Sequence, residues 1–292
     1  MKKFLSLLLS MMVLSTAFAG CSSPSETPDS SNETSMAKPA GDLPEEVQGI
    51  VDRGVLRVGV KNNVLGFGFE DPLSGEYSGM EVEIAKNIGE TLGIPVEFTN
   101  VTAATRTQLL DSGDLDCVIA TFTITDERKE SWDFTTPYFT DYVSILVENS
   151  SGITDLAGLV DKKVGVSSGS TSARSLTKEM IDQGLISGEA FDPETFDPNT
   201  WTEGVSFQQY DDYPTISTAL TAGEVDAFSV DKSILAVYNT DSRSYLDSQF
   251  SPQNYGVATK KDSQLSTFVE DLITTWLEDG TIDSLIEANG LK

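Results

Sequence analysis

The chain has 292 residues, a formal net charge of −27 and no histidine. A surface this acidic disfavours nucleic acid and anionic lipid headgroups as partners. The absence of histidine excludes a Ser-His-acid triad and any zinc site that uses His ligands. With only two cysteines, Cys21 and Cys117, no disulfide framework is expected. We interpret Cys117 as a small buried hydrophobe, and we expect no cofactor and no metal.

Residues 1–20 predict export. Lys2 and Lys3 precede the apolar run Phe4–Phe18, which is shorter than the roughly 20 residues that span a bilayer. Small residues then precede Cys21, and this junction resembles a bacterial lipoprotein signal. The resemblance implies that Cys21 is lipidated and becomes the mature N-terminus; ordinary signal cleavage is the alternative. Cleavage would remove two lysines and change the net charge from −27 to −29.

Residues 21–41 predict a flexible linker that follows the lipidated cysteine. This segment is rich in Ser, Thr, Pro and Asn, and it has too few apolar residues to offset the entropy of ordering. The folded part is therefore expected over residues 42–292, which is enough for one large domain or two smaller ones. No later segment is long and apolar enough to span a membrane.

The first half of the folded part alternates predicted helices and strands. Apolar residues at every fourth position predict an amphipathic helix at Gly79–Leu92. The segment Leu115–Phe122 is apolar enough to be a strand buried on both faces, as in a parallel sheet. In chain order we expect a helix at Glu45–Asp52, a strand at Val55–Val60, a turn at Asp71–Gly75, a helix at Gly79–Leu92, a strand at Ile94–Val101, a helix at Ala103–Gly113 and a strand at Leu115–Phe122.

A second alternation follows a break near Tyr138–Ser144. We expect strands at Tyr142–Asn149, Lys162–Gly169, Val205–Tyr210, Val225–Val230 and Asn254–Lys260, and helices at Thr171–Gly184, Asp212–Gly223, Asp231–Tyr238, Leu265–Leu277 and Ile282–Ala288. Two strand–helix runs of this kind predict an α/β fold with two lobes and largely parallel sheets.

Several long motifs carry a family resemblance. They are "GEYSGMEVEIAKNIGETLGI" from Gly75, "ATFTITDER" from Ala120, "DFTTPYF" from Asp133, "DYPTISTAL" from Asp212 and "VDAFSVDKSI" from Val225. In order and spacing the chain resembles family 3 extracellular solute-binding proteins of ABC importers, and specifically members that bind aspartate and glutamate. The resemblance covers roughly Val55 to the C-terminus. Leu65 replaces a commonly seen proline, Met80 replaces a larger residue, and 186–203 reads as an insertion.

The resemblance implies the type II periplasmic-binding-protein fold. Two α/β lobes enclose a ligand cleft, two crossover segments join them, and the lobes close over the ligand. We expect lobe 1 at residues 42–142 plus 253–292, and lobe 2 at residues 143–252. Loops at strand ends and helix N-termini supply the ligand contacts in such a cleft.

Arg128 is the first candidate site residue. Its planar guanidinium matches a carboxylate, and Thr121 and Thr123, two apart on an extended segment, would point to the same side. The alternative is a solvated arginine paired with Glu127. The resemblance implies that Arg128 holds the α-carboxylate of an amino acid.

Thr171 and Asp231 each precede a predicted helix, so helix capping is one interpretation of both. The resemblance implies that Thr171 gives a backbone N–H to the ligand carboxylate. It also implies that Asp231 binds the α-ammonium group, and such pairing would lower the pKa of Asp231.

Lys61, Arg106 and Tyr213 are the candidates for reading the ligand side chain. Two cations at element ends, in a chain with few cations, favour a second ligand carboxylate; pairing with surface acids is the alternative. We therefore expect a monomeric lipoprotein at the outer face of the cytoplasmic membrane that passes glutamate or aspartate to an ABC permease. The alternatives are a binder of a neutral polar amino acid such as glutamine or cystine, a dehydratase-like enzyme on the same fold, and a receptor sensor domain.

Overall fold

The computed structural model describes residues 42–291. The signal peptide, the lipidated Cys21 and the linker predicted for residues 1–41 lie outside this range. Within the described range, no helix has the length and apolar character needed to cross a membrane. No group of acidic or cysteine side chains in that range is arranged to hold a metal ion.

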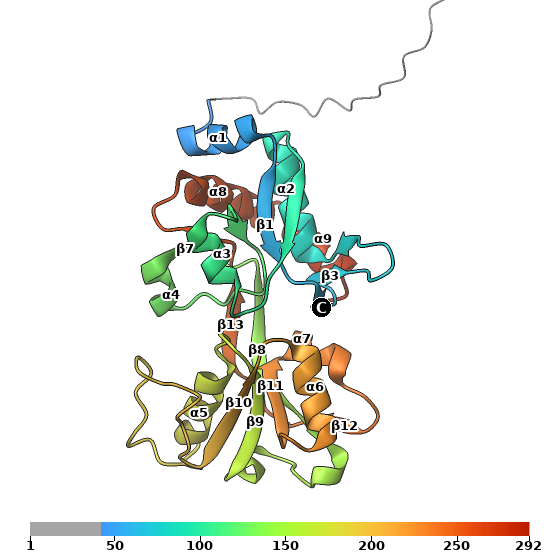
Figure 1. Cartoon of the computed structure of the whole chain (residues 1–292), viewed down its shortest axis with the longest axis vertical. Helices are drawn as coiled ribbons and strands as arrows, with labels where there is room; N and C mark the ends of the chain where they lie inside the picture. Colours follow the sequence, from blue (N-terminus) through green and yellow to red (C-terminus); the bar gives the residue numbers. More distant parts are fainter. Residues whose placement is uncertain (1–41, 292) are drawn as a thin grey trace, which may run out of the picture. The chain divides into compact units, whose positions relative to one another are not determined.

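The first large sheet is mixed and has five strands (Figure 1). Strands β5 (Val96–Asn100), β1 (Leu56–Val60) and β6 (Cys117–Val118) run parallel, and β14 (Ala258–Lys260) and β7 (Trp132–Phe134) extend it antiparallel. The helices of this region are α1 (Glu45–Arg53), α2 (Met80–Leu92), α3 (Arg106–Ser112), α4 (Asp126–Ser131), α8 (Gln264–Glu278) and α9 (Thr281–Ala288). A small antiparallel sheet of β2 (Asn63–Val64), β3 (Gly68–Glu70) and β4 (Tyr77–Ser78) lies between β1 and α2 in the chain.

The second large sheet has six strands in a similar mixed arrangement. Strands β10 (Val205–Tyr210), β9 (Lys162–Ser167) and β11 (Ala227–Asp231) run parallel, and β8 (Phe139–Glu148), β12 (Arg243–Tyr245) and β13 (Phe250–Tyr255) are antiparallel additions. Helices α5 (Ser172–Asp182), α6 (Tyr213–Ala222) and α7 (Lys232–Leu235) and three 3₁₀ turns at Asn149–Ser151, Leu156–Leu159 and Ala236–Tyr238 complete it.

Both faces of the second sheet are covered, and the sequence of β8 shows why. Val143, Ile145 and Val147 pack in the same core cluster as α5, whereas Leu146 packs with α6. Successive strand residues point to opposite faces, so a continuous apolar run suits a sheet that has a helix on each side. Figure 1 shows α5 and α6 flanking β9 accordingly.

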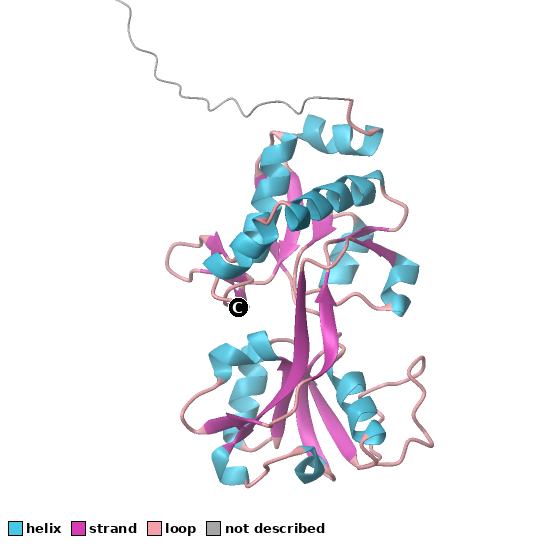
Figure 2. Cartoon of the chain, turned by 180° about the vertical axis from the view of Figure 1, so that it is seen from behind, coloured by secondary structure: helices cyan, strands magenta, loops and turns pink. Residues whose placement is uncertain are grey.

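Two long strands carry the chain between the sheets. β8 follows β7 of the first sheet, and β13 precedes β14 on the way back. They pair antiparallel with Tyr142 opposite Pro252, and Figure 2 shows them side by side. A movement of one large sheet relative to the other would therefore bend or twist these two strands.

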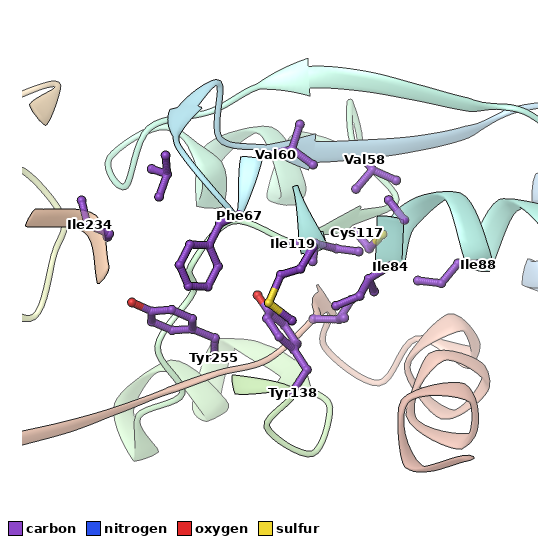
Figure 3. Packing of buried hydrophobic residues seen from close by; sticks show 14 of the residues in the cluster. Val58, Val60, Phe67, Ile84, Ile88, Cys117, Ile119, Tyr138, Ile234 and Tyr255 are labelled. Carbon is purple, nitrogen blue, oxygen red and sulfur yellow. The ribbon is translucent and has the colours of Figure 1, made fainter. Parts of the chain in front are cut away.

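Helix α2 forms as its spacing predicts. Ile84, Ile88 and Leu92 are fully buried, and Figure 3 shows the first two close to Val58 and Cys117 of the first sheet. The helix begins at Gly79, whose φ is 119° and where an added Cβ would lie 2.2 Å from the Phe67 carbonyl oxygen, so only glycine fits. The expectation that Cys117 is buried is confirmed, and burial raises the pKa of its thiol well above the usual range.

Three expectations about strands were wrong. The sheets are not largely parallel, because each adds antiparallel strands to a parallel core of three. The strand expected at Leu115–Phe122 ends at Val118, and the one expected at Asn254–Lys260 divides into the end of β13 and the whole of β14. Hydrophobicity marks burial, but these apolar residues also occur in buried loops where the chain leaves a sheet.

Candidate functional site

The candidate residues converge at the C-terminal ends of the parallel strands, where α/β proteins commonly bind ligands. Lys61 follows β1, Thr121 and Thr123 follow β6, Thr171 follows β9, and Asp231 ends β11. Every candidate of the described chain is buried except Arg128, which is partly exposed. The structure thus brings together side chains that are up to 170 positions apart in the sequence.

Arg128 connects loops from the two large sheets. Its Nη1 donates to the Thr123 carbonyl at 2.7 Å, and its Nη2 donates to the Gly169 carbonyl at 3.0 Å. Glu127 forms its ion pair with Arg174 at 2.8 Å, so the solvated Arg128–Glu127 pair is not observed. Burial, followed by repulsion from Arg106 and Arg174, lowers the pKa of Arg128 to about 9.

Gln253, which was not among the candidate residues, joins two of the candidate threonines. The hydroxyls of Thr123 and Thr171 donate to Gln253 Oε1 at 2.9 and 2.7 Å. Gln253 lies on β13 and is 2% exposed. Thr171 occupies the N-cap position of α5, but its hydroxyl does not cap that helix. The sequence pointed to Gln253 only through its position at the start of the returning crossover segment, residues 253–292.

Thr121 departs from the extended backbone that was expected. Its φ is 43°, a left-handed value that is unusual for a β-branched residue. Such strain costs about 1–3 kcal/mol and persists where surrounding contacts fix it. Here the Thr121 N–H donates to Glu81 Oε1 at 2.6 Å, and the Thr121 carbonyl accepts from Arg106 Nη1 at 3.2 Å. Thr121 and Thr123 therefore do not share one side of a strand.

Arg106 and Lys61 are buried cations in different surroundings. Arg106 Nη1 also donates to the Ala120 carbonyl at 2.9 Å, and its Cζ lies 3.8 Å from the centroid of the Phe122 ring. Its Nε has no hydrogen-bond partner within residues 42–291. Lys61 Nζ lies 5.4 Å from the centroid of the Tyr213 ring. Burial, followed by repulsion from Arg106, lowers the pKa of Lys61 to about 7.

Asp231 does not have the helix-capping role that was one interpretation of it. Its carboxyl group accepts a hydrogen bond from the Tyr255 hydroxyl and not from the backbone of α7. Asp141 takes the capping role instead, with its Oδ2 accepting from the Ser233 N–H at 3.0 Å. Without a ligand, burial and then repulsion from Asp141 raise the pKa of Asp231 to about 7; the lowering expected from pairing with an ammonium group stays a prediction. The hydrogen bond from Tyr255 and the attraction of nearby arginines are too weak to offset burial.

Glu81 is the second residue that sequence reasoning missed. It is 0% exposed, and its Oε1 accepts from the Tyr138 hydroxyl at 2.6 Å as well as from Thr121. Burial raises its pKa to about 7. The signal was present, because Glu81 precedes Ile84 and Ile88 at helical spacing and so lies on the buried face of α2.

A cavity of about 320 Å³ opens beside these residues. Arg106, Arg128 and Thr171 line it, together with Arg174 and with Phe196 of the segment read as an insertion. Lys61, Thr121, Thr123, Tyr213 and Asp231 are not among its lining residues. Three arginines therefore line the cavity, and Arg174 among them is already paired with Glu127.

The chain is similar in sequence and in fold to known amino-acid-binding proteins. A glutamine-binding protein of Geobacillus stearothermophilus is 31% identical over 271 residues, which cover 90% of this chain and 94% of the relative. A glutamate-binding protein of Corynebacterium glutamicum is 27% identical over 260 residues, covering 82% and 79%. The solved structure of an ancestral arginine-binding protein bound to arginine matches with a TM-score of 0.67 and 32% identity, covering 81% of this chain and 98% of that one.

The family model for bacterial extracellular solute-binding proteins, family 3, matches residues 56–290. This match spans both large sheets and all eight candidate residues of the described chain. The solved structures that resemble the chain are type II periplasmic binding proteins, as the sequence predicted. The chain therefore belongs to family 3 of the bacterial extracellular solute-binding proteins.

Proposed function

We propose that this protein captures an acidic amino acid, glutamate or aspartate, and delivers it to the permease of an ABC importer. The similar proteins are named for different amino acids, namely glutamine, glutamate and arginine. They therefore support an amino-acid ligand, but they do not identify which amino acid it is. Residues 42–142 plus 253–292 and residues 143–252 would form the two lobes. They would close over the ligand by bending at β8 and β13.

The common part of an amino acid has two opposite charges, and the site offers a partner for each. Arg128 lines the cavity and would bind the α-carboxylate, helped by the Thr171 backbone at the start of α5. Asp231 is 5% exposed and would bind the α-ammonium group. Each partner is needed, because an unpaired buried charge costs several kcal/mol.

We choose a ligand with an acidic side chain because of the charge balance of the remaining buried groups. Lys61 and Arg106 are 2% and 3% exposed, and the carboxyl group of Glu81 is the acid beside them. The carboxylate of Asp231 also acts on both cations, but it is assigned to the α-ammonium group of the ligand. The two cations and Glu81 then leave a net charge of +1 in a buried region. One carboxylate on the ligand side chain, with Tyr213 as a possible donor, would neutralise it.

A neutral polar ligand, such as glutamine or cystine, is the second candidate. The 31% identity to a glutamine-binding protein favours it, and so does the pKa of Lys61, which is about 7. If Lys61 is neutral, the opposite charges of Arg106 and Glu81 already cancel, and the site needs no carboxylate from the ligand side chain. A thermal-shift screen against the twenty amino acids tests the class, since a ligand stabilises the protein in proportion to the logarithm of its excess over Kd.

The pH dependence of binding should separate these candidates. Glutamate needs an ionised Asp231 and a protonated Lys61, and each group has a pKa of about 7. Its affinity should therefore fall above pH 7, when Lys61 loses its proton. Below pH 7 protonation of Asp231 should lower it, and protonation of Glu81, whose pKa is also about 7, should partly offset that loss. Each linked proton changes the affinity by up to about tenfold per pH unit.

Calorimetric titrations between pH 5.5 and 8.5 measure this profile. Glutamine should lose affinity only on the acid side, because it does not require a charged Lys61. Identical profiles for glutamate and glutamine would contradict the assigned role of Lys61.

The protein would act outside the cytoplasmic membrane, attached through lipid on Cys21. One acyl chain binds membranes only marginally, and a lipoprotein modification with more than one chain makes the attachment stable. The Cys21→Ala variant should therefore leave the membrane fraction for the soluble extracytoplasmic fraction. Unchanged membrane fractionation of this variant would argue against a lipid anchor.

A further inference from the structure

Glu81 lies beneath the candidate site, on the first turn of α2. The start of this helix is fixed by backbone hydrogen bonds from Met80 to Gly66 at 2.8 Å and from Glu81 to Phe67 at 3.1 Å. The side chain of Glu81 is completely buried. A carboxylate near a helix N-terminus is stabilised by the helix dipole, which favours a charge here in spite of burial.

The two oxygens of the Glu81 carboxyl group have different surroundings. Oε1 accepts from the Thr121 N–H and the Tyr138 hydroxyl, both at 2.6 Å. Oε2 is buried and has no hydrogen-bond partner among the described residues. The charged groups that act on this carboxyl are Lys61 and Arg106, and both favour its ionised form.

Neither cation has a carboxylate hydrogen bond of its own in the described chain. Arg106 donates to the carbonyl groups of Ala120 and Thr121, and Lys61 Nζ faces the Tyr213 ring. Glu81 therefore acts on both through space rather than as a member of one tight pair. Asp231 acts on the same two cations, but it is the proposed partner of the ligand's α-ammonium group. The charge of Glu81 contributes to the potential of the whole site.

We propose that Glu81 determines which ligand charge the site accepts, by neutralising one of the two buried cations Lys61 and Arg106. With Glu81 ionised, the three groups carry +1 and match a single side-chain carboxylate. This inference rests on the proposed function, since it assumes an amino-acid ligand whose side chain approaches Lys61 and Arg106. It makes Glu81 a specificity-determining residue that does not itself contact the ligand.

The Glu81→Gln variant tests this role, because the amide oxygen can still accept the hydrogen bonds from Thr121 and Tyr138. The three groups then carry +2. The ratio Kd(glutamine)/Kd(glutamate), measured by calorimetry at pH 7, should rise by about tenfold, largely because glutamine binds more weakly. A purely structural role would weaken both ligands by the same factor, and an unchanged ratio would therefore overturn the proposal.

The double variant Lys61→Met/Glu81→Gln provides the matched control. Its remaining cation restores a charge of +1, so its ratio should return to about the wild-type value, whereas Lys61→Met alone should lower the ratio. Comparing Lys61→Met with the double variant also tests the role of Glu81 if Glu81→Gln alone does not fold. Equal Kd ratios in these two variants would overturn the proposal.

The proposed ligand is tested separately by the wild-type protein. If the wild type prefers glutamine but Glu81→Gln still shifts the ratio towards glutamate, the acidic-ligand assignment fails and the role of Glu81 stands. If the wild type prefers glutamate and the ratio does not respond to Glu81, only the role of Glu81 fails.

Discussion

Replacing Arg128 with alanine should strongly weaken the binding of every amino acid. Arg128 would hold the α-carboxylate that all amino acids share, and its guanidinium also links the Thr123 and Gly169 carbonyls of the two large sheets. Removing one partner of a buried charge pair costs about 2–5 kcal/mol, which corresponds to a loss of thirtyfold to several thousandfold in affinity. Calorimetry with each ligand that stabilises the wild type measures the loss.

Arg174→Ala is the matched control for this variant. Arg174 lines the same cavity, but its ion pair with Glu127 is partly exposed, so its removal should cost at most about 1 kcal/mol. The melting temperature of each variant without ligand shows whether the fold is intact. Tight binding by a folded Arg128→Ala protein would remove Arg128 from the site.

Replacing Lys61 with methionine should have the largest effect on specificity. Methionine keeps much of the apolar stem of lysine and removes the charge that a ligand carboxylate would meet. Glutamate should lose about tenfold or more in affinity, and glutamine should change little, because it has no side-chain charge to pair. Titrating the variant with both ligands measures the two changes independently.

Lys61 is a better probe of side-chain recognition than Arg106. Arg106 donates to the carbonyl groups of Ala120 and Thr121, so changing it also disturbs the strained backbone at Thr121. The ammonium group of Lys61 faces the Tyr213 ring, and it donates to no backbone carbonyl in the part of the chain that the structure describes. Equal weakening of glutamate and glutamine in Lys61→Met would mean that Lys61 supports the fold of the site and does not read the ligand charge.

The regular elements were predictable wherever local spacing determines burial. The helix at Gly79–Leu92 and the strand at Val55–Val60 appear within one residue of their expected bounds as α2 and β1. Their apolar residues repeat at the helical or strand period, and glycines stand where the chain turns. The short strands β2, β3, β4, β7 and β12 were missed, since two or three residues give no periodic signal.

The irregular backbone of the site was not predictable from local pattern. Thr121 looked like part of a strand, yet its φ of 43° is fixed by Glu81 and Arg106, which lie 40 and 15 positions away. Gln253 depends in the same way on Thr123 and Thr171, at separations of 130 and 82 positions. Tertiary contacts of this range override local preference.

The ionisation of the site also required the structure. Sequence reasoning considered Asp231 with a cation beside it, whereas burial and Asp141 raise its pKa to about 7. Glu81 and Lys61 have pKa values near 7 for the same reason, burial. Burial depends on which elements close over a side chain, and no single segment of sequence contains that information.

The most direct test of the account is a calorimetric titration of the purified protein with glutamate and with glutamine at pH 7. A neutral amide leaves the net positive charge of Lys61, Arg106 and Glu81 without a partner, which costs a few kcal/mol. Glutamate should therefore bind about a hundredfold more tightly than glutamine. Equal affinities, or tighter binding of glutamine, would contradict the proposed acidic ligand.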